Sequence, residues 1–174
     1  VVLQWGTETF TVTFNGNGGT TTATPVSQSS VGDTVSIAES TTATRTGFTF
    51  LGWNTLANGT GTNITAGPGY LPPSNITLFA RWSANTYAVT FDKNTPSGVA
   101  ATGTMANMSI VAGTAKALTT NGFARIGYVF RNWNSLADGT GTTYADLANV
   151  TFFANTTVYA QWNPILTYNI NGGD

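Results

Sequence analysis

The chain has 174 residues, enough for one domain or two small ones, and 41% of them are hydrophobic, so packed cores are expected. Only 7% are charged and the formal charge is -1, which argues against nucleic-acid binding and membrane-surface binding. The chain has no Cys or His, which excludes Ser-His-Asp and Cys-His catalysis and the usual zinc sites, and no stretch is apolar enough for a membrane span.

Taken in chain order, the predicted elements are strands with one buried and one wet face. Apolar residues alternate with polar ones in four segments of the first half, at residues 10–14, 35–37, 48–53 and 76–82. In the last of these, Phe79 and Arg81 fall on the face opposite the apolar one. No window of a dozen residues shows a helical apolar stripe without Gly or Pro, so any helix is short. We expect the first and last strands to pair.

The second half repeats the first. Gly47–Thr62 is answered by Gly127–Thr142 and Leu78–Trp82 by Val158–Trp162, in both cases 80 residues later. Phe10–Phe14 and Tyr87–Phe91 lie only 77 residues apart, which places a three-residue insertion between residues 92 and 104. The chain therefore contains two whole units of a tandem array.

The boundaries follow from the repeat. We assign residues 1–9 to the end of a preceding repeat and a linker, 10–82 to a first module, 83–86 to a linker, 87–162 to a second module and 163–174 to the start of a further repeat. The outer assignments rest on Val2–Trp5 and Thr167–Gly173, which echo parts of the two units. The chain opens without a signal peptide, so we expect an internal or mature segment.

Three blocks in this order resemble a known family. The strand Thr11–Asn15 followed by Asn17–Gly19, then Arg45–Trp53, then Leu78–Trp82 is similar to the Listeria-Bacteroides repeat, also called the internalin B-type B repeat. The resemblance implies a mostly β, small α+β module, with tandem β-grasp-like (ubiquitin-like) repeats arranged as an elongated rod. It also implies a stalk or host-contact role in bacterial cell-surface proteins, and it assigns no active site.

The second unit departs from the family pattern at three places. Asn132 stands where Gly52 stands, Arg131 where Leu51 stands, and Asp92–Pro96 replaces Asn15–Gly19. These changes affect the expected loop shapes and leave the aromatic positions intact.

The acidic residues do not form a repeated cluster. Glu8, Asp33 and Glu39 have no partner in the second unit, so paired-carboxylate catalysis is not expected. The loops 58–62 and 138–142 suggest calcium or phosphate binding, with Asp146 as a further calcium ligand. Calcium needs more carboxylates and phosphate a Lys with a following helix, so a turn with Gly at positive φ is favoured.

The aromatic residues and lysines offer other candidate sites. The tryptophans, which could be sugar platforms, occupy strand ends typical of core packing; they are Trp5, Trp53, Trp82, Trp133 and Trp162. Phe79 and Tyr159 are better surface candidates. Lys93 and Lys116 could form an isopeptide bond in the second unit only, since the first has no lysine.

These observations favour a non-catalytic tandem-repeat module of a secreted or cell-surface bacterial protein, acting as a stalk or spacer and in adhesion. We expect no catalytic, metal or cofactor-binding residues and no cofactor, while the sequence identifies no ligand-binding residue. The expected partner is a host or neighbouring-cell surface protein or glycan, with no nucleic acid and no membrane insertion, and the chain is expected to be an extracellular, wall-attached or secreted monomer. The alternative is a carbohydrate-binding module accessory to a secreted enzyme.

Overall fold

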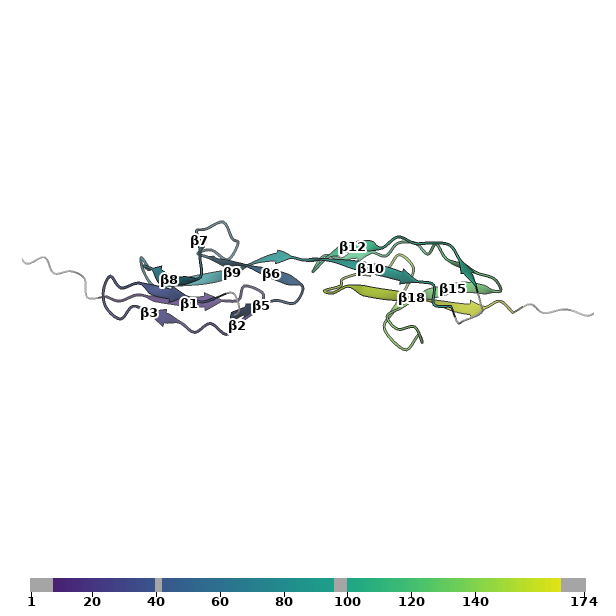
Figure 1. Ribbon diagram of the computed structural model, residues 1–174, viewed down its shortest axis with the longest axis horizontal. Helices are drawn as coiled ribbons and strands as arrows, with labels where there is room; N and C mark the ends of the chain where they lie inside the picture. The colour runs from purple at the N-terminus through teal and green to yellow at the C-terminus, as the bar shows by residue number, and fades with distance from the viewer. Residues whose placement is uncertain (1–7, 40–41, 96–99, 167–174) are drawn as a thin grey trace, which may run out of the picture. The chain divides into compact units, whose positions relative to one another are not determined.

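The computed structural model describes residues 8–39, 42–95 and 100–166 (Figure 1). The repeat-like termini at Val2–Trp5 and Thr167–Gly173 lie outside the described residues, as does part of the expected insertion, at 96–99. The chain separates into two compact units, Val1–Asn85 and Thr86–Asp174. Each is described by itself below.

Unit 1 is built on a five-stranded sheet in the order β3-β1-β9-β6-β7. Its strands are β1 (Thr11–Asn15), β3 (Val26–Ser27), β6 (Phe48–Asn54), β7 (Asn63–Ile64) and β9 (Ile76–Ala84). The first strand, β1, pairs with the last, β9, in parallel, and the other pairs are antiparallel. Two small ladders complete the unit: β2 (Thr20–Thr21) with β5 (Ala43–Thr44), and β4 (Val35–Ile37) with β8 (Gly67–Tyr70).

Unit 2 repeats this topology in the order β12-β10-β18-β15-β16. Its strands are β10 (Thr86–Asp92), β12 (Met108–Val111), β15 (Tyr128–Asn134), β16 (Thr143–Tyr144) and β18 (Thr156–Pro164). The parallel pair is β10 with β18, as in unit 1. The small ladders join β11 (Ala101–Thr102) to β14 (Ala124–Arg125) and β13 (Lys116–Ala117) to β17 (Asn149–Val150).

The mostly β class expected from the sequence is confirmed, and the predicted pairing of first and last strands occurs in both units. The described residues contain no α-helix, so the helical part of an α+β module is not found there. The expected linker at 83–86 is mostly strand, because β9 continues through Ala84 and β10 begins at Thr86.

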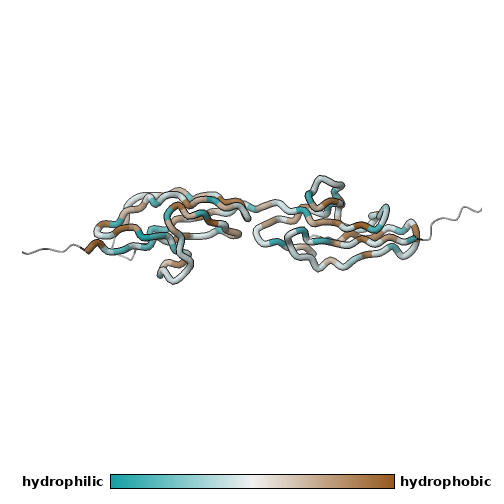
Figure 2. The backbone as a smooth tube through the Cα atoms, turned by 180° about the vertical axis from the view of Figure 1, so that it is seen from behind, coloured by the Kyte–Doolittle hydropathy of each residue, from teal (hydrophilic) through white to brown (hydrophobic). Residues whose placement is uncertain are grey.

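Each unit has its own apolar core beneath its sheet. Figure 2 shows apolar residues interspersed with polar ones along the strands of both units. Trp53 is fully buried in unit 1, where its ring centroid lies 4.8 Å from Phe14 and 5.2 Å from Phe50. Its Nε1 donates a 2.8 Å hydrogen bond to the carbonyl of Ala38. Trp133, equally buried, takes the same position in unit 2 and is surrounded by three phenylalanine rings.

The other two tryptophans lie at the edge of the core. The expectation of core packing holds fully for Trp53 and Trp133, but Trp82 and Trp162 are only half-buried. Each still has a fixed position, since Nε1 of Trp82 donates to the carbonyl of Gly16 and Nε1 of Trp162 to that of Lys93. They are half-buried because each lies on the last strand beyond the residues that pack on the central tryptophan.

The positions at which unit 2 differs from the family pattern do not change the strand pairing. β6 and β15 each contain a bulge, between Phe50 and Gly52 and between Phe130 and Asn132. Gly52 adopts a φ of +118°, which favours glycine, whereas Asn132 maintains the bulge without a positive φ.

A buried asparagine after the central tryptophan organises the following loop. Nδ2 of Asn54 donates to the carbonyls of Gly59 and Gly61 and to Oδ1 of Asn63, and its Oδ1 accepts from the N–H groups of Leu56 and Gly61. Asn134 makes the same bonds in unit 2, with Thr143 Oγ1 in place of the asparagine oxygen. Because every polar atom of the carboxamide is paired, its hydrogen bonds offset the cost of removing it from water, and they fix the loop shape.

We predict that Trp53→Ala destabilises unit 1 by about 3 to 5 kcal/mol, because it removes a fully buried ring and leaves a cavity. Trp82→Ala should cost less, about half as much, since that ring is only partly buried. Urea titration of the whole chain, followed by NMR signals from each unit, measures both. Equal losses for the two variants would contradict the distinction between central and peripheral tryptophans.

We predict that Asn54→Ala costs about 2 to 3 kcal/mol, because it leaves two carbonyls and two N–H groups of the loop, whose bonds to Asn54 are partly buried, without these partners. The matched control is Asn58→Ala in the same loop, where only exposed turn bonds are lost and the cost should stay below about 1 kcal/mol. Hydrogen exchange at the Leu56 and Gly61 amides should accelerate in Asn54→Ala alone.

Candidate functional site

The loops 58–62 and 138–142 are turns rather than ion cradles. Oδ1 of Asn58 accepts from the N–H and hydroxyl of Thr60, at 3.1 and 2.8 Å, and Asp138 makes the same two bonds with Thr140 at 3.0 and 2.7 Å. Gly59 and Gly139 follow with φ near +75° and +79°. The turn interpretation of the sequence is confirmed, and the space inside each loop is filled by the carboxamide of Asn54 or Asn134.

The two acids proposed as calcium ligands serve separate structural purposes. Hydrogen bonds from the backbone N–H and then the hydroxyl of Thr140 lower the pKa of Asp138, so its carboxylate is ionised at neutral pH. Asp146 Oδ1 instead accepts from the N–H of Asn121 and from Nε1 of Trp133. Within the described ranges, no three His, Cys, Asp or Glu side chains gather where they could hold a metal ion.

The lysines and the surface aromatics are likewise accounted for by local contacts. Lys116 Nζ donates to the carbonyl of Ser109 at 2.7 Å, and Lys93 Nζ approaches the carbonyl of Ala101 at 3.4 Å. Both amines therefore contact backbone oxygens. Phe79 and Tyr159 lie half-buried on the sheet face opposite the core, as the alternation indicates.

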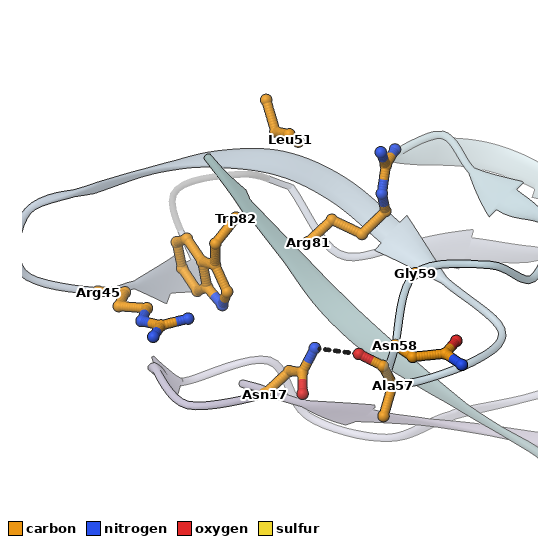
Figure 3. A pocket seen from close by; sticks show the side chains of 8 residues that line it. All are labelled: Asn17, Arg45, Leu51, Ala57, Asn58, Gly59, Arg81 and Trp82. Carbon is orange, nitrogen blue, oxygen red and sulfur yellow. Dashed lines mark hydrogen bonds between the residues drawn. The ribbon is translucent and has the colours of Figure 1, made fainter. Parts of the chain in front are cut away.

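A polar groove of about 290 Å³ in unit 1 brings together residues from five parts of the sequence, among them the exposed Leu51 of β6 (Figure 3). Strand β9 contributes Arg81 and Trp82, the residue after β5 is Arg45, and Asn17 belongs to the turn after β1. The loop 57–59 forms another wall. We refer to this site as the arginine groove.

The walls of the arginine groove are held by specific contacts. Nδ2 of Asn17 donates to the carbonyls of Ala57 and Ala80, at 2.8 and 2.9 Å, and so ties the turn after β1 to the opposite loop and to β9 (Figure 3). Asn17 adopts a φ of +46° to do so. The guanidinium carbon of Arg45 lies 3.8 Å from the Phe48 ring centroid, a cation-π contact that fixes the side chain.

Sequence reasoning did not single out this groove. A signal was present, because Arg45 and Arg81 are the only basic residues among the first 85. A second signal was Asn17, which aligns with Asn94 at the 77-residue spacing; Asn94 makes the same two bonds, to Ala137 and Ala160. The replacement of Asn15–Gly19 by Asp92–Pro96 thus retains the one side chain that joins the loops.

The comparisons with known proteins agree with the repeat structure. The sequence profile of the Listeria-Bacteroides repeat domain matches residues 10–81 and 87–161. The chain is 31% identical to Internalin H of Listeria monocytogenes, covering 92% of this chain and 26% of that protein. It is 33% identical to an Evansella cellulosilytica protein whose name describes it as a Gly-rich membrane protein, covering 82% of this chain and 17% of the relative.

The chain thus spans about a quarter or less of the length of these relatives. No solved structure gave a match. Among the described residues, no helix has the length and apolar character required to cross a membrane. Two profile matches cover most of the chain and coincide with two units of the same topology, so the chain belongs to the Listeria-Bacteroides repeat family.

Proposed function

We propose that the chain is a load-bearing, non-catalytic spacer within a bacterial surface protein, which carries a more distal part of that protein toward a host or neighbouring cell. The observation that carries the proposal is the parallel pairing of the first and last strand in each unit. Because the first and last strands are parallel, the chain enters the unit at one end and leaves it at the other. Each unit then adds length, whereas an antiparallel pair would return the chain to its starting point.

The strand lengths fit this role. β9 and β18 each contain nine residues, which corresponds to roughly 30 Å at about 3.3 Å per residue. We propose that β-grasp-like units follow one another in this way as an extended, monomeric rod. The names of the relatives, an internalin and a Gly-rich membrane protein, support a surface-exposed or membrane-associated setting.

The absence of catalysis is part of the same proposal. Asp138, Asp146 and Lys116, which the sequence offered as chemical sites, take part in turns or hydrogen bonds to neighbouring residues. The carbohydrate-binding alternative required exposed tryptophan faces. Trp53 and Trp133 are instead fully buried, and Trp82 and Trp162 are half-buried with their indole N–H groups bonded.

The geometry also determines how a unit responds to force. When β1 is pulled from its start and β9 from its end, all hydrogen bonds between the two parallel strands are loaded together in shear. When both strands are pulled from the same end, the bonds break one after another. A spacer stretched between its two ends experiences the first geometry.

We predict a large difference in unfolding force between these two directions in unit 1. The chain has no native cysteine, so handles can be attached at Glu8→Cys with Ala84→Cys for shear, and at Thr20→Cys with Ala84→Cys for peeling. Single-molecule stretching should give a several-fold higher force in the shear geometry. Equal forces would contradict the load-bearing proposal, and urea titration of both variants controls for any loss of stability.

A further inference from the structure

We propose that the arginine groove of unit 1 binds a single anionic oxygen group, a carboxylate or phosphate carried on a sugar or polyol of a surface polymer. This inference goes beyond the spacer role, which requires no ligand. It also assigns different chemistry to the two repeats, because unit 2 has a glutamine at the position of Arg81 and a carboxylate at the position of Asn58.

The positive charge of unit 1 is concentrated at this groove. Arg45 and Arg81 are its only basic residues, and both line the groove although 36 positions separate them in the sequence. Neither guanidinium forms an ion pair within the described residues. Glu39 lines a neighbouring groove together with Arg81, and no ion pair within 4.0 Å joins them. The groove is therefore lined by two arginines that have no ion-pair partner among the described residues.

The two arginines contribute differently. The stacking of Arg45 on Phe48 holds the guanidinium plane in place and leaves its in-plane N–H groups available for an oxygen acceptor. Arg81 projects from β9 away from Arg45 (Figure 3). Its half-exposed side chain has rotatable bonds with which it can turn toward a bound anion.

Neutral donors complete the site. Asn58 lines the groove, and its Nδ2 has no hydrogen-bond partner among the described residues, while its Oδ1 is held by Thr60. The Asn17 bonds to the carbonyls of Ala57 and Ala80 keep the wall in position before a ligand arrives. Such preorganisation reduces the entropy lost on binding.

Unit 2 has the same backbone arrangement with a different distribution of charged residues. At the 80-residue spacing, Gln161 replaces Arg81 and Asp138 replaces Asn58, while Arg125 is retained in place of Arg45. Arg131 stands where Leu51 lines the groove of unit 1, so unit 2 keeps two arginines at these positions and adds a carboxylate. Asp138 forms the same turn as Asn58, so the exchange alters charge and preserves shape. The carboxylate of Asp138 would repel an anion, which distinguishes the two repeats.

The size and charge of the groove favour one anionic group over a long run of them. The volume of about 290 Å³ accommodates a phosphate or carboxylate with part of its sugar or polyol. The chain as a whole carries a formal charge of -1, so it offers no extended basic surface for a polyelectrolyte. Acidic polysaccharides and polyol-phosphate polymers share this chemistry.

The test is an NMR titration of the complete 174-residue chain with glucuronate, glycerol phosphate, inorganic phosphate and neutral glucose. We expect saturable shifts for the amides of residues 57–59 and 81–82 with the anions and none with glucose. A preference for glucuronate or for glycerol phosphate identifies the source of the anionic group. Shifts with inorganic phosphate equal to those with both organic anions would overturn the sugar or polyol part of the proposal.

Two variants taken from unit 2 provide the matched controls. Arg81→Gln and Asn58→Asp should each weaken anion binding by roughly tenfold. Both are compatible with the fold, because unit 2 carries Gln161 and Asp138 at these positions. The paired change Asp138→Asn and Gln161→Arg should create anion binding at the equivalent site of unit 2.

The proposal is overturned if none of the anions produces saturable shifts in unit 1, or if binding persists unchanged in Arg81→Gln and Asn58→Asp. Unchanged spectra elsewhere in unit 1 verify that these variants are folded. The shear measurement does not involve the groove, so the failure of one proposal is distinguishable from the failure of the other.

Discussion

The parallel contact between the first and last strand of each unit is the constraint on which the rest of the structure depends. Val12 pairs with Ile76 and Val89 with Thr156, so each contact closes most of a unit into one loop. Closing so long a loop costs conformational entropy that only the packing beneath the sheet can offset. The central tryptophan, buried under this pair, supplies much of that packing. Because the first and last strands are parallel, the chain also leaves each unit at the end opposite to the one at which it enters.

The strands with a clear alternation could be predicted from the sequence, because half-buried strands impose a period of two. β1, β4, β6 and β9 begin and end within two residues of the expected bounds. Two-residue ladders such as β2 with β5 are too short to show this alternation in the sequence. No local sequence pattern indicates that β1 and β9 pair in parallel. The role of Asn54 depends on carbonyls that its own loop brings together, and Arg45 and Arg81 come to line one groove only after folding. Net charge therefore gave no indication of the groove.

The two units share the same strand order and central tryptophan, and they differ in the residues that contact this tryptophan. In unit 2, Phe123 packs on Trp133, whereas unit 1 has Ala43 at the equivalent position. The indole N–H of Trp133 donates to Asp146, whereas that of Trp53 in unit 1 donates to the carbonyl of Ala38. A repeat can accept such exchanges because its stability comes from its own strand pairing and aromatic packing. The outer residues are then free to differ, which allows one unit to carry an anion site and its neighbour a carboxylate at the same place.

The most direct measurement compares two fragments of unit 2, residues 85–165 and residues 85–154, the second of which lacks β18. If closure by the last strand makes each unit self-sufficient, the longer fragment should unfold in one cooperative thermal transition, and the shorter one should show no transition and no dispersed NMR spectrum. A disordered longer fragment would mean that the unit needs its neighbour. A folded shorter fragment would contradict the central role of the parallel pair.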